Sequence, residues 1–145
     1  MDENGYIVLR SSNIQDGKLD LNDVVRVDVS IPDKLKVCRN DIIICARNGS
    51  KRLVGKSALV DIDLNNLTFG AFMAICKTPF YEFVSKYLLS NCFFEQLKQV
   101  SGTTTINQLT QASFNSFFIP IPPLEEQNRI VNKINVILND IKGEN

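Results

Sequence analysis

The chain has 145 residues, enough for one domain, and 44% of them are apolar, so a core can form without disulfides or a structural metal. Sixteen Lys and Arg residues balance sixteen Asp and Glu residues, which argues against a protein that holds nucleic acid by net charge alone. The chain contains no His, the commonest general base, and this disfavours a hydrolase.

The first third of the chain has the residue pattern of short strands joined by turns. Tyr6 to Arg10 is rich in β-favouring residues, and Asp16-Gly17 is a typical turn pair. Apolar residues alternate with polar ones between Val24 and Val29, which predicts a half-buried strand. The nearly continuous apolar run from Asp41 to Arg47 predicts a strand that is buried on both faces.

A basic hairpin is predicted directly after this buried strand. Asn48-Gly49 favours a tight two-residue turn in which both residues adopt positive φ, and Leu53 to Val60 is the expected returning strand. The segment from Lys34 to Val60 holds seven basic residues and one acidic residue. A two-stranded ribbon fits the major groove of DNA, and Arg can pair with guanine in bidentate fashion. The hairpin is therefore either a solvated tip or a DNA-recognition element.

The middle of the chain predicts one more buried strand and one helix. Phe69 to Cys76 is the strand candidate. Thr78-Pro79 is a favourable helix start, and apolar residues recur at helical spacing up to about Lys98. Ser101-Gly102 breaks this pattern, and Thr110 is expected to cap a further helical turn.

The C-terminal segment predicts an extended lead-out followed by a long helix. Phe117 to Ile121 is strand-like, but the prolines on its C-terminal side predict an edge strand or a lead-out. The helix begins at Pro122-Pro123 and ends at Lys142-Gly143. Four isoleucines spaced 4, 3 and 4 residues apart form the stripe of a coiled coil: Ile130, Ile134, Ile137 and Ile141. We expect this stripe to face a partner helix, and the alternative is packing on the domain's own sheet.

Several chemistries find no support in the sequence. Gly49 to Ser57 does not fit a phosphate-binding loop, because five residues rather than four separate its glycines. The four cysteines form no CxxC pair, so we expect free thiols in a reducing cytoplasm and no metal site. The longest apolar runs are far shorter than about 20 residues, so we expect no membrane span. Asp61 and Asp63 have no third metal ligand nearby. A small enzyme with a carboxylate pair is a further alternative, and the missing His and the lack of clustered Asp or Glu argue against it.

The junction between the lead-out and the long helix carries a family resemblance. Residues 119–131 have the sequence IPIPPLEEQNRIV, and this strand, proline break and Glu-Glu-Gln helix start closely resemble the domain-to-helix junction of type I restriction–modification specificity subunits. Shorter pieces resemble the same family in order, and the resemblance covers about residues 5 to 142. These pieces are Gly5 to Ile7, Asn13 to Gly17, Asn40 to Ile44, Tyr87 to Ser90 and Gly102 to Thr104.

The resemblance implies an α+β fold: a twisted, mainly antiparallel, β-rich recognition domain with a mid-domain helix, then a C-terminal coiled-coil-type helix. The implied domains are residues 1–121 for DNA target recognition and residues 122–145 for the start of a spacer or dimerisation helix. The implied function is reading one half-site of double-stranded DNA, with methyltransferase and restriction subunits as partners and neither cofactor nor catalysis in this chain. A helix-mediated protein-interaction module that does not read DNA is the alternative.

Direct readout in a DNA groove is the expected mechanism. The first candidates for DNA contact lie in the hairpin, and they are Arg47, Asn48, Ser50, Lys51, Arg52 and Lys56. The second set is Ser101, Thr103, Thr104, Thr105, Arg10 and Asn13. Strand propensity alone is the alternative explanation for the threonines, and a plain surface charge is the alternative for Arg10. The family carries two recognition domains and this sequence carries one, so we expect a fragment, a rearranged cassette or a half-length subunit that dimerises through the isoleucine stripe.

Overall fold

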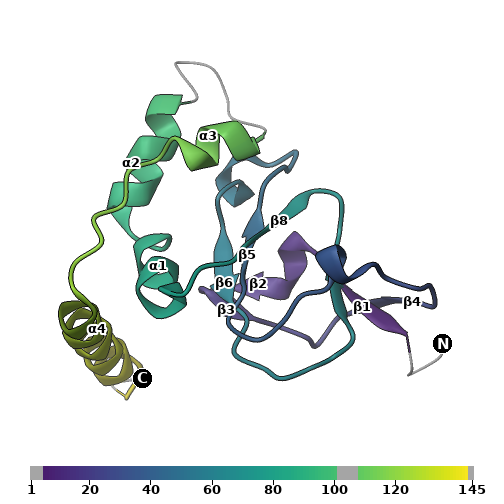
Figure 1. The fold of residues 1–145 in the computed structure, drawn as a ribbon, viewed down its shortest axis with the longest axis horizontal. Helices are drawn as coiled ribbons and strands as arrows, with labels where there is room; N and C mark the ends of the chain where they lie inside the picture. The colour runs from purple at the N-terminus through teal and green to yellow at the C-terminus, as the bar shows by residue number, and fades with distance from the viewer. Residues whose placement is uncertain (1–4, 101–107, 144–145) are drawn as a thin grey trace.

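The computed structural model describes residues 5–100 and 108–143. Its described strands form three small sheets, two of three strands and one of two strands (Figure 1). The strands are β1 (Tyr6–Leu9), β2 (Ile14–Gln15), β3 (Lys18–Leu19), β4 (Val25–Val27), β5 (Ile42–Cys45), β6 (Ser57–Leu59), β7 (Leu67–Phe69) and β8 (Met73–Cys76). The helices are α1 (Tyr81–Tyr87), α2 (Asn91–Val100), α3 (Gln111–Asn115) and α4 (Leu124–Gly143), with 3-10 turns η1 (Ser11–Asn13), η2 (Asp33–Leu35) and η3 (Lys51–Leu53).

Most strand pairings are antiparallel, as expected. The sheet β6-β5-β8 is antiparallel throughout, and so is the hairpin β2-β3. In the sheet β4-β1-β7, β1 is antiparallel to β4 but parallel to β7, because a crossover through the central sheet separates β1 from β7 in the chain. The expected α+β class is thus confirmed, with one parallel pair.

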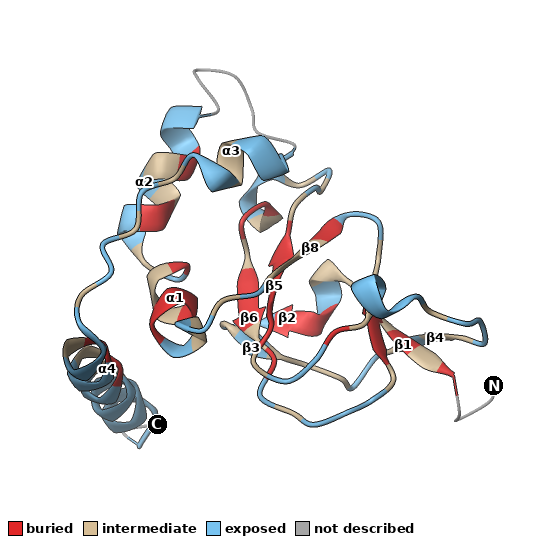
Figure 2. Ribbon diagram, viewed as in Figure 1, coloured by how far each residue is buried: buried red, intermediate tan, exposed pale blue. Residues whose placement is uncertain are grey.

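Strand β5 is the centre of the fold. All four of its residues are buried, since it has a neighbouring strand on each edge and a hydrophobic cluster on each face (Figure 2). Ile43 and Cys45 point into a cluster shared with β1 and β7. Ile42 and Ile44 point the other way, into a cluster shared with α1 and α2. The continuous apolar run in the sequence is therefore explained by burial on both faces.

The predicted strand from Phe69 to Cys76 is wrong, because the chain turns in its middle. The amide of Met73 donates to the carbonyl of Gly70 (2.9 Å), and the amide of Gly70 donates to that of Leu9 (3.0 Å). This turn moves the chain from the sheet that contains β1 to the sheet that contains β5. The apolar run thus belongs to two strands in different sheets.

The predicted single helix from Thr78 to Lys98 is also wrong, since the structure has two helices. The Ser90 hydroxyl (2.6 Å) and amide (2.9 Å) both donate to the carbonyl of Tyr87, which ends the first helix locally. After this turn, Phe93 and Leu97 of α2 join the cluster that contains Val84 of α1. The helical spacing of apolar residues continues across the turn at Ser90 because α1 and α2 pack on the same cluster.

The segments around α3 and α4 agree with the sequence analysis. The Thr110 side chain caps α3 by accepting a hydrogen bond from the amide of Ser113 (3.1 Å). The segment before α4 is a lead-out rather than a strand, and Gln96 provides its backbone partners: Oε1 accepts from the amide of Phe118 (2.8 Å), and Nε2 donates to the carbonyl of Phe118 (2.7 Å). The division into domains at residues 121 and 122 falls in this lead-out and stays a prediction. Across the described ranges, no helix is long and apolar enough to cross a membrane.

Candidate nucleic-acid interface

Three connections meet at the Cys45 end of the central sheet. They are η1 with the preceding Arg10 (residues 10–13), the β5–β6 connection (residues 46–56) and the β7–β8 turn (residues 70–72), and we call them together the basic end. Asn48 Nδ2 donates to Ser11 Oγ (3.2 Å), which ties the first connection to the second. The carbonyl of Phe72 accepts from the amides of Ala46 (2.9 Å) and Arg47 (3.0 Å), which ties the second to the third.

The β5–β6 connection is not the tight hairpin that Asn48-Gly49 predicted. Positive φ occurs instead at Gly55 (88°), and neither Asn48 nor Gly49 adopts it. Asn48 Oδ1 accepts from the amide of Ser50 (2.9 Å), and this local Asx turn replaces the expected hairpin turn. The returning strand β6 begins at Ser57 rather than at Leu53, because η3 includes Leu53 and the chain turns at Gly55, where φ is positive.

The connection is long but firmly anchored. Leu53 packs against the cluster on one face of β5, and Val54 is buried in the cluster on the other face. Beyond the paired residues of β5 and β6, the Gly55 amide donates to the carbonyl of Cys45 (2.8 Å), and the Cys45 amide donates to the carbonyl of Lys56 (2.8 Å). The exposed residues between these anchors are therefore presented on a fixed backbone.

The basic end carries uncompensated positive charge. Residues 42–60 include four basic residues, Arg47, Lys51, Arg52 and Lys56, and no acidic residue. Arg47, Lys51 and Arg52 are exposed, whereas Lys56 is half-buried. Within residues 5–100 and 108–143, none of the four forms an ion pair. A cationic surface that lacks internal partners is suited to phosphate.

The two candidates near η1 differ from this group. Arg10 Nη2 lies 3.2 Å from Asp23 Oδ2, so its charge is balanced within the fold. Asn13 is buried: its Nδ2 donates to the carbonyls of Asp20 (2.9 Å) and Asp23 (2.8 Å), and its Oδ1 accepts from the amide of Arg10 (3.0 Å). The amide group of Asn13 is thus used inside the protein, which argues against a contact with DNA, and the predicted contact stays a prediction.

Other candidates divide into those that lie outside the described residues and those that hold the basic end together. Ser101, Thr103, Thr104 and Thr105 lie outside the described residues. Asn48 and Ser50 are half-buried and hydrogen-bonded to each other, so their main role here is to shape the connection.

Sequence reasoning missed Phe72, which is 58% exposed and lies beside Arg47. Its sequence context resembles a strand interior, so nothing there indicated an exposed turn.

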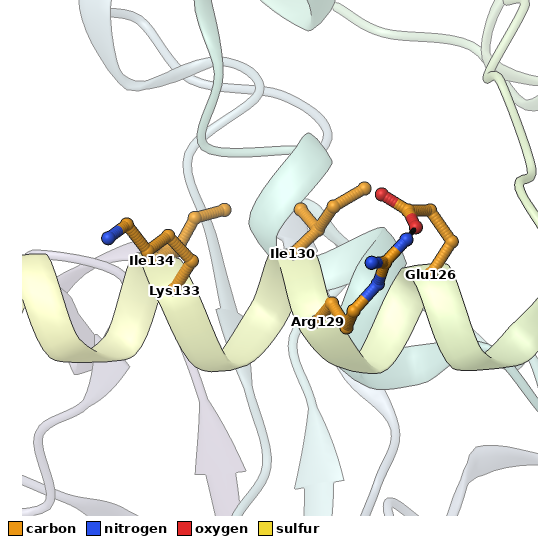
Figure 3. A pocket seen from close by; sticks show the side chains of 5 residues that line it. All are labelled: Glu126, Arg129, Ile130, Lys133 and Ile134. Carbon is orange, nitrogen blue, oxygen red and sulfur yellow. Dashed lines mark hydrogen bonds and ion pairs between the residues drawn. The ribbon is translucent and has the colours of Figure 1, made fainter.

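Only part of the predicted isoleucine stripe of α4 packs against the rest of the fold. Val131 and Gln127 are buried, and a pocket between α1 and α4 is lined by both. Ile137 and Ile141 are exposed by 47% and 58%, so packing on the domain's own sheet does not account for the stripe. Figure 3 shows Ile130 and Ile134 projecting from α4 along a shallow groove, beside Lys133 and the paired side chains of Glu126 and Arg129.

The cysteines are free thiols in two environments. Cys38 and Cys92 are exposed. Burial raises the pKa of the Cys45 thiol, and burial together with the Asp41 carboxylate raises the pKa of Cys76. Both inner thiols are thereby kept in the neutral form, which is a poor nucleophile and a poor metal ligand. No group of three or more His, Cys, Asp or Glu side chains placed to hold a metal occurs in the described part of the chain.

Comparisons with known proteins agree on one family. The profile of the family described as "Type I restriction modification DNA specificity domain" matches residues 2–145. The specificity subunit of the type I restriction enzyme EcoKI, from Escherichia coli strain K12, is 34% identical over 138 residues, and that of StySPI, from Salmonella potsdam, is 31% identical over 138 residues. Each match covers 92% of this chain and 30% of the relative.

Solved structures share the fold. The HsdS subunit from Thermoanaerobacter tengcongensis superposes with a TM-score of 0.73 at 23% identity, over 95% of this chain and 37% of that one. A chain from a structure of a type I R-M system, titled for its complex assembly and conformational transition, superposes with a TM-score of 0.74 at 22% identity and the same coverage. The architecture described above, sheets and α4 together, is thus shared with these chains.

Proposed function

Because this chain belongs to the family of type I restriction modification DNA specificity domains, we propose that it reads one half of a split double-stranded DNA target within a type I restriction–modification system. The chain spans about 30% of the length of the curated relatives it matches, which is a fitting size for one recognition unit with the start of the helix that follows. It serves here as a specificity component, with no catalysis and no cofactor of its own, and acts in the cytoplasm.

The observation that supports DNA reading is the basic end. The four cations of its β5–β6 connection have no carboxylate partner among the described residues, and this connection is anchored in both hydrophobic clusters. Phosphate contacts from Lys51, Arg52 and Lys56 would fix the domain on the duplex, and base-edge contacts would select the sequence. A fixed backbone favours affinity, because less conformational entropy is lost on binding.

Selection from a random duplex library tests this function. We expect the chain, at low salt, to enrich one short motif, which names the half-site. Replacing Lys51 by Ala should weaken binding to all duplexes alike and reduce the salt dependence by about one phosphate contact. Lys34→Ala is the matched control, because Lys34 is an exposed lysine of η2 outside the basic end. Retention of duplexes without enrichment of any motif would contradict sequence-specific reading.

We further propose that α4 joins this domain to its partners. The exposed apolar residues of its C-terminal half suit a second helix, supplied by the methyltransferase subunit, by another segment of a specificity subunit or by a second copy of this chain. The restriction subunit would then join through that assembly. A homodimer through Ile130, Ile134, Ile137 and Ile141 would restore two half-site readers by symmetry.

Analytical ultracentrifugation tests the homodimer. We expect a concentration-dependent dimer that Ile137→Asp abolishes, because a charge would be placed in the apolar seam. Asn132→Asp is the control: it adds the same charge at an exposed position outside the stripe and should leave the dimer intact. A wild-type chain that stays monomeric at high concentration would exclude the homodimer and leave the other two partners to be tested by co-purification.

A further inference from the structure

We propose that Arg47 and Phe72 form a guanine-reading pair that exists before DNA binds, in which Phe72 is the positioning residue and Arg47 contacts the base. This inference rests on the proposed function and assigns a chemical role to two residues of the basic end. It also separates Arg47 from the other three cations of the β5–β6 connection, which contact phosphate.

The backbone of Arg47 is held from two sides. Its amide donates to the carbonyl of Phe72 (3.0 Å), and the amide of Ala46 donates to the same carbonyl (2.9 Å). On the other side Arg47 forms a β-bridge with Gln108, and the carbonyl of Ala46 accepts from the amide of Leu109 (2.6 Å). The Cα–Cβ direction of Arg47 is therefore set by the fold, as a base-reading side chain requires.

The side chains of the pair are in cation–π contact, and both are exposed. Arg47 Cζ lies 5.4 Å from the centre of the Phe72 ring, within the range of a cation–π contact. The Phe72 side chain is 58% exposed, and Arg47 is exposed as well. A guanidinium group that lies over the face of a ring leaves N–H groups at its edge free, and these N–H groups can form the bidentate contact with guanine O6 and N7.

Neither side chain of the pair has another partner in the described fold. Arg47 has no carboxylate partner within residues 5–100 and 108–143, and Phe72 belongs to neither hydrophobic cluster. No ring contact is found for Lys51, Arg52 or Lys56 in the described ranges. The alternative is that Arg47 only shields the Phe72 ring from water, and this alternative predicts no preference for any base.

The test is the base preference of matched variants. The wild-type chain is used to select duplexes from a random library, and binding is then measured by fluorescence anisotropy for the enriched duplex and for its three substitutions at each position. We expect one guanine to be preferred by about 5- to 150-fold, the range for one bidentate pair. Arg47→Lys should remove that preference and leave the others, since the charge is retained but the planar group is lost.

Two substitutions of Phe72 separate positioning from simple packing. Phe72→Leu retains apolar bulk without a ring, and we expect it to reduce the guanine preference by about 2- to 5-fold. Phe72→Tyr retains the ring and should preserve the preference. Arg39→Lys is the control for Arg47→Lys, because it makes the same replacement at an exposed arginine outside the basic end and should leave all base preferences unchanged. Thermal unfolding checks that each variant folds.

The outcomes are distinct. The pair is supported if the guanine preference is lost in Arg47→Lys, reduced in Phe72→Leu and preserved in Phe72→Tyr. A wild-type motif that Arg47→Lys reads with unchanged preferences overturns the inference and leaves the proposed function intact. A wild-type chain that enriches no motif overturns both.

Discussion

Two asparagines in the same part of the fold show how burial decides the role of a side chain. Asn13 is buried and makes three hydrogen bonds to backbone groups of Arg10, Asp20 and Asp23. Asn48 is half-buried and holds the β5–β6 connection against Ser11. Asparagine suits base recognition at either position, and only burial and hydrogen-bond partners distinguish a structural amide from an available one.

Replacing Asn13 by Ala should destabilise the fold by about 1–3 kcal/mol, because three backbone groups lose their partner. Urea unfolding measures this loss. Asn48→Ala is the comparison, and we expect a loss of under about 1 kcal/mol because its surroundings admit water. A variant Asn13→Ala of unchanged stability that binds DNA more weakly would restore Asn13 as a DNA contact.

At the scale of elements, sequence patterns predicted what depends on burial and local chemistry. The continuous apolar run identified β5, the Asp16-Gly17 pair identified the β2–β3 turn with positive φ at both residues, and Thr110 was identified as a cap. The patterns failed where tertiary contacts choose between local options. Apolar residues continue across the turn at Gly70 and across Ser90, so the apolar pattern of the sequence does not mark either break.

The candidate site was predictable only in part, for a similar reason. Basic residues in the β5–β6 connection are visible in the sequence as a run without acids. Their proximity to η1 and to Phe72 depends on pairing between strands far apart in the chain, which single-sequence patterns do not encode. The charge could thus be predicted, whereas the neighbour that orients one of the charges could not.

The two glycines of the β5–β6 connection should respond differently to Ala. Gly55 has a φ of 88°, and an added Cβ would lie 2.7 Å from Leu97 Cδ2, so Gly55→Ala should cost about 1–3 kcal/mol. Gly49 has no atom within 4 Å of an added Cβ and no positive φ, so Gly49→Ala should change stability by under about 0.5 kcal/mol. Thermal unfolding compares them. An equally large loss for Gly49→Ala would instead support the tight turn at Asn48-Gly49.

At the scale of the whole molecule, α4 is attached to the globule mainly by its first half. Gln127 and Val131 are buried, whereas Val136, Ile137, Leu138 and Ile141 are exposed. Twenty residues of helix extend about 30 Å, so a large part of its apolar surface lies beyond the contact with α1. Stability of the isolated chain and binding to a partner are therefore expected to depend on different residues of the same helix.

Val131→Ala should cost about 1–3 kcal/mol, because buried methyl groups are removed from the α1–α4 contact. Ile141→Ala should change stability by under about 0.5 kcal/mol when measured at dilution, since the residue is exposed. Urea unfolding followed by circular dichroism measures both. A negligible effect of Val131→Ala would mean that α4 does not pack on α1 in solution.

Stability should also rise with pH in the alkaline range because of Lys86. Burial, followed by the charges of Lys18 and Lys142, lowers the pKa of Lys86 in the folded state. Between the lowered pKa of Lys86 in the folded chain and its ordinary pKa in the unfolded chain, the unfolded chain binds more protons. The cost to stability of a charged Lys86 is therefore full below this pH range and is relieved as the pH rises through it. Lys86→Gln should therefore raise the Tm near neutral pH.

The gain from Lys86→Gln should shrink as pH approaches about 10, the ordinary range of a lysine. It should also shrink in about 1 M salt, which screens the two neighbouring charges. Lys34→Gln, at an exposed lysine, is the control and should show neither effect. A gain that is independent of pH would point to packing rather than charge as its cause.

The position of β5 has a consequence for how new specificities can arise. This strand is paired on both edges and buried on both faces, so its amides should exchange with solvent only when the whole domain unfolds. The connection that carries Arg47, Lys51 and Arg52 starts at the end of this strand and contributes only Leu53 and Val54 to the clusters. Mutation at the exposed positions between Cys45 and Leu53 should therefore cost little stability. Under the proposed function, a lineage can replace the side chains that contact DNA one at a time while every intermediate still folds.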